Sequence, residues 1–350
     1  MFIILWGIKI MYKIVKINEL NEETIKEWKE LWNLSKNKNY FNSFEWFENY
    51  TSTFSIKQFI LLKGYSTKGL EFILPLIYVK KNNLKCIGGK YLDKVSFLYN
   101  DNPMKCIDNL KRYAKENHIS ITLYECDFNT CFLENKDCII EFASDNPYVD
   151  LNQNLDNVIK SKEKRYIKNI IRKNNELNFK IIVGKNAQNY IETIFDIENR
   201  SNKPKLRKAL FIDDKSKNLF RKISQTKYGM LCILYYNGLP IAHMFGLIVP
   251  NQTFMAYHMA YDKQYRKYQP GKLVIYHLLN YLKNQSYSIF DFSRGNSILK
   301  RHFSIENAKH YNIYINPNLN IKIHFIYKKN IIFLKKNIKK ILKRLGLWKK

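Results

Sequence analysis

The chain has 350 residues, of which 46% are hydrophobic and 15% aromatic, which is enough for one large core or two of ordinary size. This composition excludes an intrinsically disordered chain, because such chains lack the apolar surface that a core requires. The formal net charge is +29, from 59 Lys and Arg against 30 Asp and Glu, so polyanionic partners are favoured: nucleic acid, anionic lipid or a phosphate-bearing small molecule.

The cysteines give no sign of a metal site. No two form a CxxC pair, and none joins a Cys/His cluster with zinc spacing. We therefore predict no metal and interpret the cysteines as free thiols, the usual state in a reducing cytosol. They are Cys86, Cys106, Cys126, Cys131, Cys138 and Cys232.

The first residues form a short apolar run that Lys9 interrupts. The run is too short for a membrane span and lacks the features of a signal peptide. We interpret residues 1–11 as a short extension or a non-native start, with translation beginning at Met11. No later stretch reaches the length of a transmembrane helix, so we predict a cytoplasmic protein, either soluble or peripheral on the inner face of the cytoplasmic membrane.

Strand and helix patterns alternate through residues 12–145, which predicts an α/β or α+β unit. Ser43 is placed to cap a short aromatic helix. Pro75 lies inside a predicted strand and indicates an edge position or a bulge. The predicted strands are 12–17, 58–63, 70–80 and 119–124, and the other predicted helices are 22–34 and 107–117.

A second unit, residues 146–316, repeats this alternation. Asn237-Gly238 is the strongest hairpin signal in the chain. One long, strongly basic helix is predicted over 155–177. Its basic side chains either form a solvated face or bind a lipid diphosphate, a CoA nucleotide or tRNA. The predicted strands are 148–151, 179–183, 230–236, 239–249, 253–261, 288–292 and 309–315, and the other predicted helices are 190–199, 215–226 and 272–284.

The tail, residues 317–350, has no Asp or Glu after Asn320, while Lys and Arg recur throughout. Its apolar residues follow helical spacing with lysines mainly on the other side, which predicts a basic amphipathic helix ending in Trp348. Such helices lie at anionic membrane surfaces, so we expect membrane contact. The alternatives are a helix docked on the protein's own core and a nucleic-acid tail.

A series of short motifs follows in order between Gly229 and Phe303. The series resembles the CelD (BcsL) family of acetyltransferases in the GNAT superfamily. The resemblance implies an α+β GNAT acyl-CoA N-acyltransferase fold, in which a mixed sheet is flanked by helices, and direct transfer from acetyl-CoA or another acyl-CoA without a metal. The motifs are Gly238-x-Pro240-Ile241-Ala242, Ala260-Tyr261-Asp262, Pro270-Gly271, Asp291-Phe292-Ser293-Arg294-Gly295 and Lys300.

The start of the basic helix, from Ser161 to Ile170, resembles the same family more weakly, as does the pattern around Trp28, Phe44 and Trp46. The related FemAB-like enzymes attach amino acids from aminoacyl-tRNA to peptidoglycan precursors and have two GNAT-like halves. The units 12–145 and 146–316 would match such an arrangement.

A phosphate site is predicted where a strand passes into a helix at Gln269-Pro270-Gly271-Lys272. Pro suits the first turn of a helix, Gly lets the backbone approach a ligand, and free amides at a helix N-terminus favour phosphate. Lys272 and Arg266 add positive charge. The resemblance implies that this turn holds the CoA pyrophosphate, although the usual pattern has a further Gly. The alternative is an ordinary helix start.

Four residues are candidate catalytic groups. Asp291 is an acid within an apolar strand, and it acts either as a base or in a structural salt bridge with Arg294, Lys300 or Arg301. His243 and His258 lie on neighbouring predicted strands and titrate near neutral pH. The resemblance implies that Glu198 and Arg200, at the end of a helix, face the site. Arg294, Lys300 and Arg200 are the candidate substrate-binding residues.

Three functions are compatible with these patterns. The first is an N-acyltransferase that moves an acyl group from acyl-CoA to an amino sugar or similar amine in cell-envelope or surface polysaccharide biosynthesis. The second is a FemAB-like transferase that uses aminoacyl-tRNA and a lipid-linked peptidoglycan precursor. The third is a non-catalytic GNAT-fold binding protein.

Overall fold

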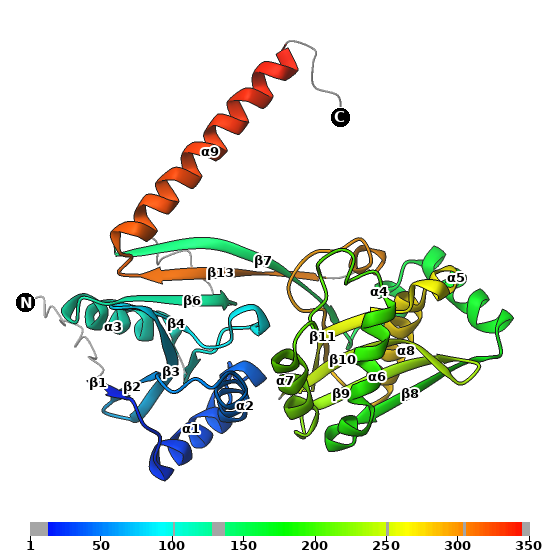
Figure 1. The fold of residues 1–350 in the computed structure, drawn as a ribbon, viewed down its shortest axis with the longest axis horizontal. Helices are drawn as coiled ribbons and strands as arrows, with labels where there is room; N and C mark the ends of the chain where they lie inside the picture. The colour runs from blue at the N-terminus through cyan, green and yellow to red at the C-terminus, as the bar shows by residue number, and fades with distance from the viewer. Residues whose placement is uncertain (1–12, 101, 128–136, 250–251, 304–305, 345–350) are drawn as a thin grey trace, which may run out of the picture.

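The computed structural model describes residues 13–100, 102–127, 137–249, 252–303 and 306–344. Over these residues the strands join one continuous mixed sheet flanked by helices (Figure 1), which confirms the predicted α+β fold. The strand order is β1-β2-β3-β4-β6-β13-β7-β12-β11-β10-β9-β8, with β5 paired to β3 off this path.

The strands in chain order are β1 (Lys13–Ile17), β2 (Ile60–Ser66), β3 (Gly69–Lys80), β4 (Asn83–Cys86), β5 (Leu98–Tyr99), β6 (Ser120–Cys126), β7 (Cys138–Asp150), β8 (Leu177–Val183), β9 (Gly229–Tyr236), β10 (Leu239–Val249), β11 (Thr253–Tyr261), β12 (Ile289–Asp291) and β13 (Glu306–Ile315). The helices are α1 (Glu22–Leu34), α2 (Phe44–Phe54), α3 (Pro103–Glu116), α4 (Leu155–Val158), α5 (Ser161–Lys173), α6 (Ile191–Arg200), α7 (Asp214–Ser224), α8 (Pro270–Asn284) and α9 (Leu319–Arg344).

Two long strands, β7 and β13, connect the two ends of the sheet. β13 pairs antiparallel with β6 on one side and with β7 on the other. β7 continues to Asp150 and pairs there with β12, so it carries the sheet from the first half into the second. The last strand of the chain therefore completes the sheet of the first half, although it follows the second half in sequence.

Two hydrophobic clusters fill the described part of the molecule. One joins the aromatic residues of α1 and α2, such as Trp28 and Trp46, to the sheet face covered by α6 and α7. The other lies on the opposite face of the second half, where Ile167 of α5 and Leu278 of α8 are fully buried. The first cluster contains residues of both halves, so hydrophobic burial holds them together.

Local signals account for most elements. Ser43 caps α2 by accepting a hydrogen bond from the Trp46 amide at 3.1 Å. Asn237 and Gly238 both have positive φ, at 48° and 75°, which is the geometry of the tight turn predicted between β9 and β10.

The prediction for Pro75 was wrong, because it lies inside the sheet rather than at an edge. On one side β3 pairs with β2, where Pro75 lies opposite Leu61. On the other side β3 pairs with β5 at Phe72 and Ile73, and with β4 from Leu76 onward. Pro75 lies where that partner changes, so its missing N–H interrupts neither ladder.

The single long helix predicted over 155–177 was also wrong. The helix is interrupted between α4 and α5 at Ile159, whose backbone is extended. Ile159 is 1% exposed and forms an isolated β-bridge with Phe303. Helical propensity is a weak preference that the burial of one apolar side chain can outweigh.

Helix α9 projects away from the rest of the protein (Figure 1). No helix in the described part of the chain combines the length and the hydropathy needed to cross a bilayer. Residues 1–11 and Trp348 lie outside the described residues.

Candidate active site

A cavity lies where two parallel strands separate. β11 and β12 are paired at Thr253–Ile289, Phe254–Phe290 and Met255–Asp291. Beyond these pairs β12 ends, while β11 continues to Tyr261. The cavity has a volume of about 600 Å³ and is lined by the next residues of both segments, Ala256 to Met259 and Phe292 to Arg294. Two strands that separate in the middle of a sheet thus open a space between them.

Both halves of the chain contribute to the walls of this cavity. Lys90, Tyr91 and Asp93 come from the first half, on a segment that begins with the 3-10 helix Gly89–Tyr91. Lys203 and Lys208 come from the segment between α6 and α7. With Lys300, these side chains give the cavity an excess of basic groups, which suits a phosphate-bearing or otherwise anionic ligand.

Three buried titratable side chains, one from α6 and one from each of two strands, form a hydrogen-bonded series whose middle member lies at the cavity wall. Glu198 Oε1 lies 2.7 Å from His258 Nε2, and His258 Nδ1 lies 3.0 Å from His243 Nε2. The three residues are 1%, 6% and 0% exposed, and only His258 lines the cavity. The sequence analysis proposed all three as catalytic residues, and the structure brings them into one hydrogen-bonded series.

The surroundings of Glu198 fix its charge. Its carboxylate accepts hydrogen bonds from the amides of Leu210 and Phe211, at 3.1 Å and 2.8 Å. Burial favours the neutral acid, but the bonds from His258 and from these amides outweigh burial and lower the pKa of Glu198 to about 2. Glu198 is therefore a fixed negative charge beside His258.

Lys203 was not identified from the sequence as a site residue. Its Nζ lies 2.9 Å from His258 Nε2 and 3.7 Å from Glu198 Oε1, and its side chain is 30% exposed. Burial, followed by the positive charge of Lys203, lowers the pKa of His258 to about 4, while burial lowers that of Lys203. His258 is consequently neutral near pH 7 and has an amine beside its ring nitrogen.

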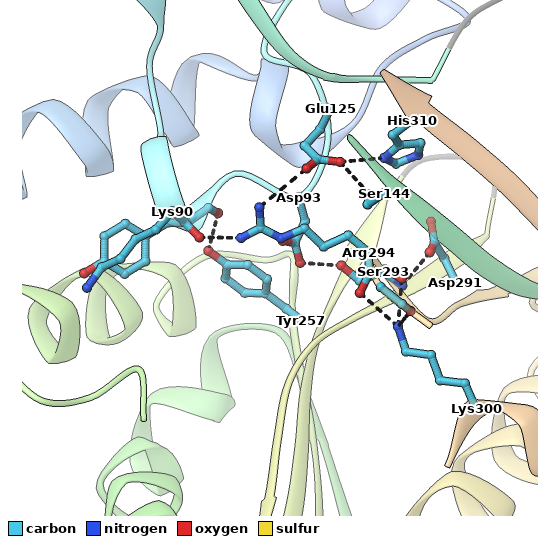
Figure 2. Close-up of polar contacts among 12 residues, drawn as sticks. Lys90, Asp93, Glu125, Ser144, Tyr257, Asp291, Ser293, Arg294, Lys300 and His310 are labelled. Atoms are coloured by element: carbon cyan, nitrogen blue, oxygen red, sulfur yellow. Dashed lines mark hydrogen bonds and ion pairs between the residues drawn. The ribbon is translucent and has the colours of Figure 1, made fainter. Parts of the chain in front are cut away.

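Asp291 is held by three donors, of which Figure 2 shows Ser293, and it does not line the cavity. Lys94 Nζ lies 2.9 Å from one carboxylate oxygen, and the other accepts from Asn146 Nδ2 at 3.0 Å and from the Ser293 amide at 2.7 Å. Burial raises its pKa, but Lys94 and the Ser293 amide outweigh burial and lower it. This geometry fits the structural salt bridge that the sequence left open, with Lys94 as the partner instead of Arg294, Lys300 or Arg301.

Arg294 joins the two halves. Its Nε lies 2.7 Å from Asp93 Oδ1, its Nη1 lies 3.6 Å from Glu125 Oε1, and it donates to the Lys90 carbonyl at 2.5 Å (Figure 2). Ser293 donates a hydrogen bond to Asp93 as well. Arg294 therefore reaches the cavity wall with its guanidinium already paired, which leaves it less free to bind a substrate.

Lys300 holds the turn that follows β12. Its Nζ donates to the carbonyls of Ser293, Arg294 and Gly295 at 2.9, 3.0 and 2.6 Å. Ser293 has a φ of 60°, which a residue with a side chain adopts at some cost, and Gly295 has a φ of 88°, which glycine adopts readily, so the three bonds from Lys300 stabilise this turn. Burial lowers the pKa of Lys300 to about 8.

The predicted phosphate turn borders the cavity from behind. A side-chain carbon added at Gly271 would lie 3.4 Å from Leu299 and 3.6 Å from Met259, and both of these residues line the cavity. Lys272 is engaged elsewhere, since its Nζ lies 2.7 Å from Glu163, which also pairs with His302. Gln269 precedes α8 with a φ of 51°, and Arg266 is exposed.

Arg200 does not line the cavity. Its guanidinium donates to Asp262 and to the Pro240 carbonyl, each at 2.8 Å, and so ties α6 to β10 and to the end of β11. Among the described residues, no group of three or more His, Cys, Asp or Glu side chains is arranged to hold a metal ion.

Residues 161–301 match the family model described as the acetyltransferase (GNAT) domain. Among curated proteins, no sequence matches this chain. The matched segment contains α5, the hairpin β9–β10, β11, α8 and β12, and therefore the series from Glu198 to His258 and most of the cavity wall.

Solved structures share the fold over most of the chain. FemX has a TM-score of 0.59 and 10% identity, covering 86% of this chain and 97% of that one. L-PGS from Bacillus licheniformis has a TM-score of 0.57 and 13% identity, covering 89% and 97%. The C-terminal domain of a putative lysylphosphatidylglycerol synthetase from Agrobacterium fabrum has a TM-score of 0.58 and 8% identity, covering 87% and 94%.

At these identities the structural similarity shows the fold alone. The family match covers the segment that supplies most of the cavity wall. The prediction of a GNAT-type acyltransferase is thereby confirmed: residues 161–301 match the acetyltransferase (GNAT) domain model, within a chain that shares its fold with FemX and L-PGS.

Proposed function

We propose that this protein transfers an acyl group from acyl-CoA to an amine of a cell-envelope or surface polysaccharide precursor, as the resemblance to the CelD family implies. The observation that carries the proposal is the neutral, buried His258, backed by Glu198, at the wall of the cavity between β11 and β12. A base for an amine must lie within hydrogen-bond reach of it, and Lys203 demonstrates that an amine fits 2.9 Å from His258 Nε2.

The proposed reaction is a direct transfer. For this step His258 carries its proton on Nδ1, which donates to His243 Nε2 at 3.0 Å and leaves the lone pair of Nε2 free. The acceptor amine takes the place of Lys203 Nζ, donates a hydrogen bond to Nε2, and attacks the thioester carbonyl with its nitrogen. As the C–N bond forms and the C–S bond breaks, the proton of the amine passes to Nε2 of His258, and the imidazolium then returns a proton to the leaving thiolate, which regenerates neutral His258 and gives free CoA thiol. The new imidazolium N–H then faces Glu198 Oε1 at 2.7 Å, so the fixed carboxylate stabilises the charge that develops.

The donor would enter through the separation of the two strands. Its phosphates would meet the basic residues of the wall, Lys203, Lys208 and Lys300. They would reach the amino end of α8 only if Leu299 and Met259, which lie in front of Gly271, moved aside. The chain offers Lys272 for this purpose only if its pair with Glu163 opens.

Ligand-dependent melting tests the proposal. A ligand that binds only the folded state raises the melting temperature, so acetyl-CoA should stabilise the protein, and incubation with amino sugars should release free thiol from acetyl-CoA. The proposal would be contradicted if a range of acyl-CoA donors produced neither stabilisation nor release of free thiol.

A FemAB-like transfer from aminoacyl-tRNA is the second candidate, favoured by the net charge of +29 and by the basic cavity wall. In the same experiment it predicts stabilisation by aminoacyl-tRNA and none by acyl-CoA. A non-catalytic binding protein predicts that no transfer occurs with either donor.

A further inference from the structure

The two sides of helix α9 meet different surroundings. Ile321 and Phe325 are half-buried at its base, where the Phe325 ring lies 5.0 Å from that of Tyr314. Lys328 forms an ion pair with Glu141 of β7. The large apolar residues that remain exposed are Leu319, Ile323, Ile326, Tyr327, Leu334 and Ile338, each between 54% and 70% exposed.

These exposed residues form one stripe, which we call the apolar stripe of α9. They are separated by three, four or seven positions, apart from the adjacent pair Ile326 and Tyr327, which places them along one side of an α-helix. Ile321 and Phe325 fall two positions away from members of the stripe, or about 200° around the helix. The base of the helix therefore contacts the protein with its other side, through Phe325 and Lys328, and the stripe lies on the side away from those contacts.

The charge of this helix has a single sign. Leu319–Arg344 contains nine Lys and Arg residues and no Asp or Glu. Lys80 and Lys81, on the turn between β3 and β4, line a hollow together with His324 and Phe325 at the base of the helix. Positive charge thus continues from the helix onto the body of the protein.

We propose that α9 lies on an anionic membrane, with the apolar stripe inserted among the lipids and the lysines at the headgroups. An anionic bilayer satisfies both sides of the helix at once. A nucleic acid would meet only the lysines and leave the stripe in water. A second copy of the helix would cover the stripe but would bring two all-positive helices together, which repel each other.

The test compares two variants for binding to vesicles by sedimentation. In the first, Ile323→Gln, Ile326→Gln, Leu334→Gln and Ile338→Gln remove the apolar stripe and keep every charge. In the control, Leu34→Gln and Leu239→Gln remove apolar residues that are 74% and 43% exposed on other elements. Neither set touches the cavity, and equal thermal melts would establish that both variants fold.

The full chain should bind vesicles of phosphatidylcholine with phosphatidylglycerol, bind phosphatidylcholine alone weakly, and lose affinity as salt rises. The stripe variant should lose at least about tenfold in affinity, since each inserted side chain contributes apolar burial, while the control should bind as the full chain does. No acyl donor or acceptor is needed, so this result does not depend on the proposed function.

Equal vesicle binding by the stripe variant and the control would overturn the proposal. It would also be overturned if the full chain dimerised in solution through the stripe and stayed off vesicles. The proposal would likewise be overturned if the full chain bound RNA and not anionic lipid, and the stripe variant bound RNA equally well.

Discussion

Replacing Lys203 with Met tests the electrostatics of the cavity most directly. The substitution keeps the unbranched stem of the side chain, which becomes one atom shorter, and removes the ammonium that lies 2.9 Å from His258 Nε2. At that distance, a unit charge destabilises an imidazolium by about 1.4 kcal/mol at the permittivity of water and by about 5.7 kcal/mol at an effective permittivity of 20. Because the Lys203 side chain is 30% exposed, we expect the lower part of this range.

The expected result is that the pKa of His258 rises from about 4 by about one to two units in Lys203→Met. The sign follows from the charge: removing a positive neighbour favours the protonated ring, while Glu198 remains beside it. NMR titration of histidine ring signals measures this without any substrate, and the His258 signal is assigned by its loss in His258→Gln.

Lys208→Met is the matched control. Lys208 lines the same cavity, and no hydrogen bond joins it to His258 in the described part of the chain. The reasoning would be refuted if the pKa of His258 stayed near 4 or fell in Lys203→Met, or if Lys208→Met shifted it equally. In a working assay, the acid limb of kcat/KM should move to higher pH in Lys203→Met by the same amount.

Four further predictions follow from the same contacts. Glu198→Gln should fold normally in far-UV circular dichroism yet lower kcat by about 10²-fold, because the imidazolium loses its carboxylate; unchanged kcat would remove Glu198 from the mechanism. Asp291→Asn should lower the free energy of unfolding by about 3 kcal/mol in urea titration, because half-buried Lys94 loses its partner, and should leave the acid limb of the pH profile in place. Arg294→Met should destabilise the protein comparably by leaving buried Asp93 unpaired, and a wild-type urea midpoint would contradict this. The pKa of His258 in the folded state lies below its ordinary 6.5, so its contribution to the free energy of unfolding should be fully present above pH 6.5 and be lost as the pH falls to about 4. The loss should reach up to about 3 kcal/mol. A urea midpoint that stays constant over this pH range would count against a buried neutral His258.

Much of the second half could be predicted because its signals are local. The Asn237-Gly238 turn requires positive φ at both residues, and the strands on either side have the expected pattern. The point at which β11 and β12 separate could not be located from the sequence, because nothing in either strand alone indicates where their pairing ends.

The parts of the site that the sequence analysis did not identify depend on contacts between residues far apart in the sequence. Lys94 reaches Asp291, and Asp93 reaches Arg294, across about 200 residues, and no local pattern links them. Lys203 follows the end of α6 at Arg200, and because the helix has ended there its side chain can turn toward His258. A basic residue following the last turn of a helix that ends in Glu-x-Arg was the one available signal, and it is a weak one.

The measurement that bears most directly on the central claim is calorimetric titration of acetyl-CoA into the wild-type protein and into Ala256→Trp, which fills the space between β11 and β12. We expect saturable binding to the wild type and none to the variant, with equal thermal melts in the absence of ligand. Equal binding to both proteins would place the donor elsewhere and contradict the account.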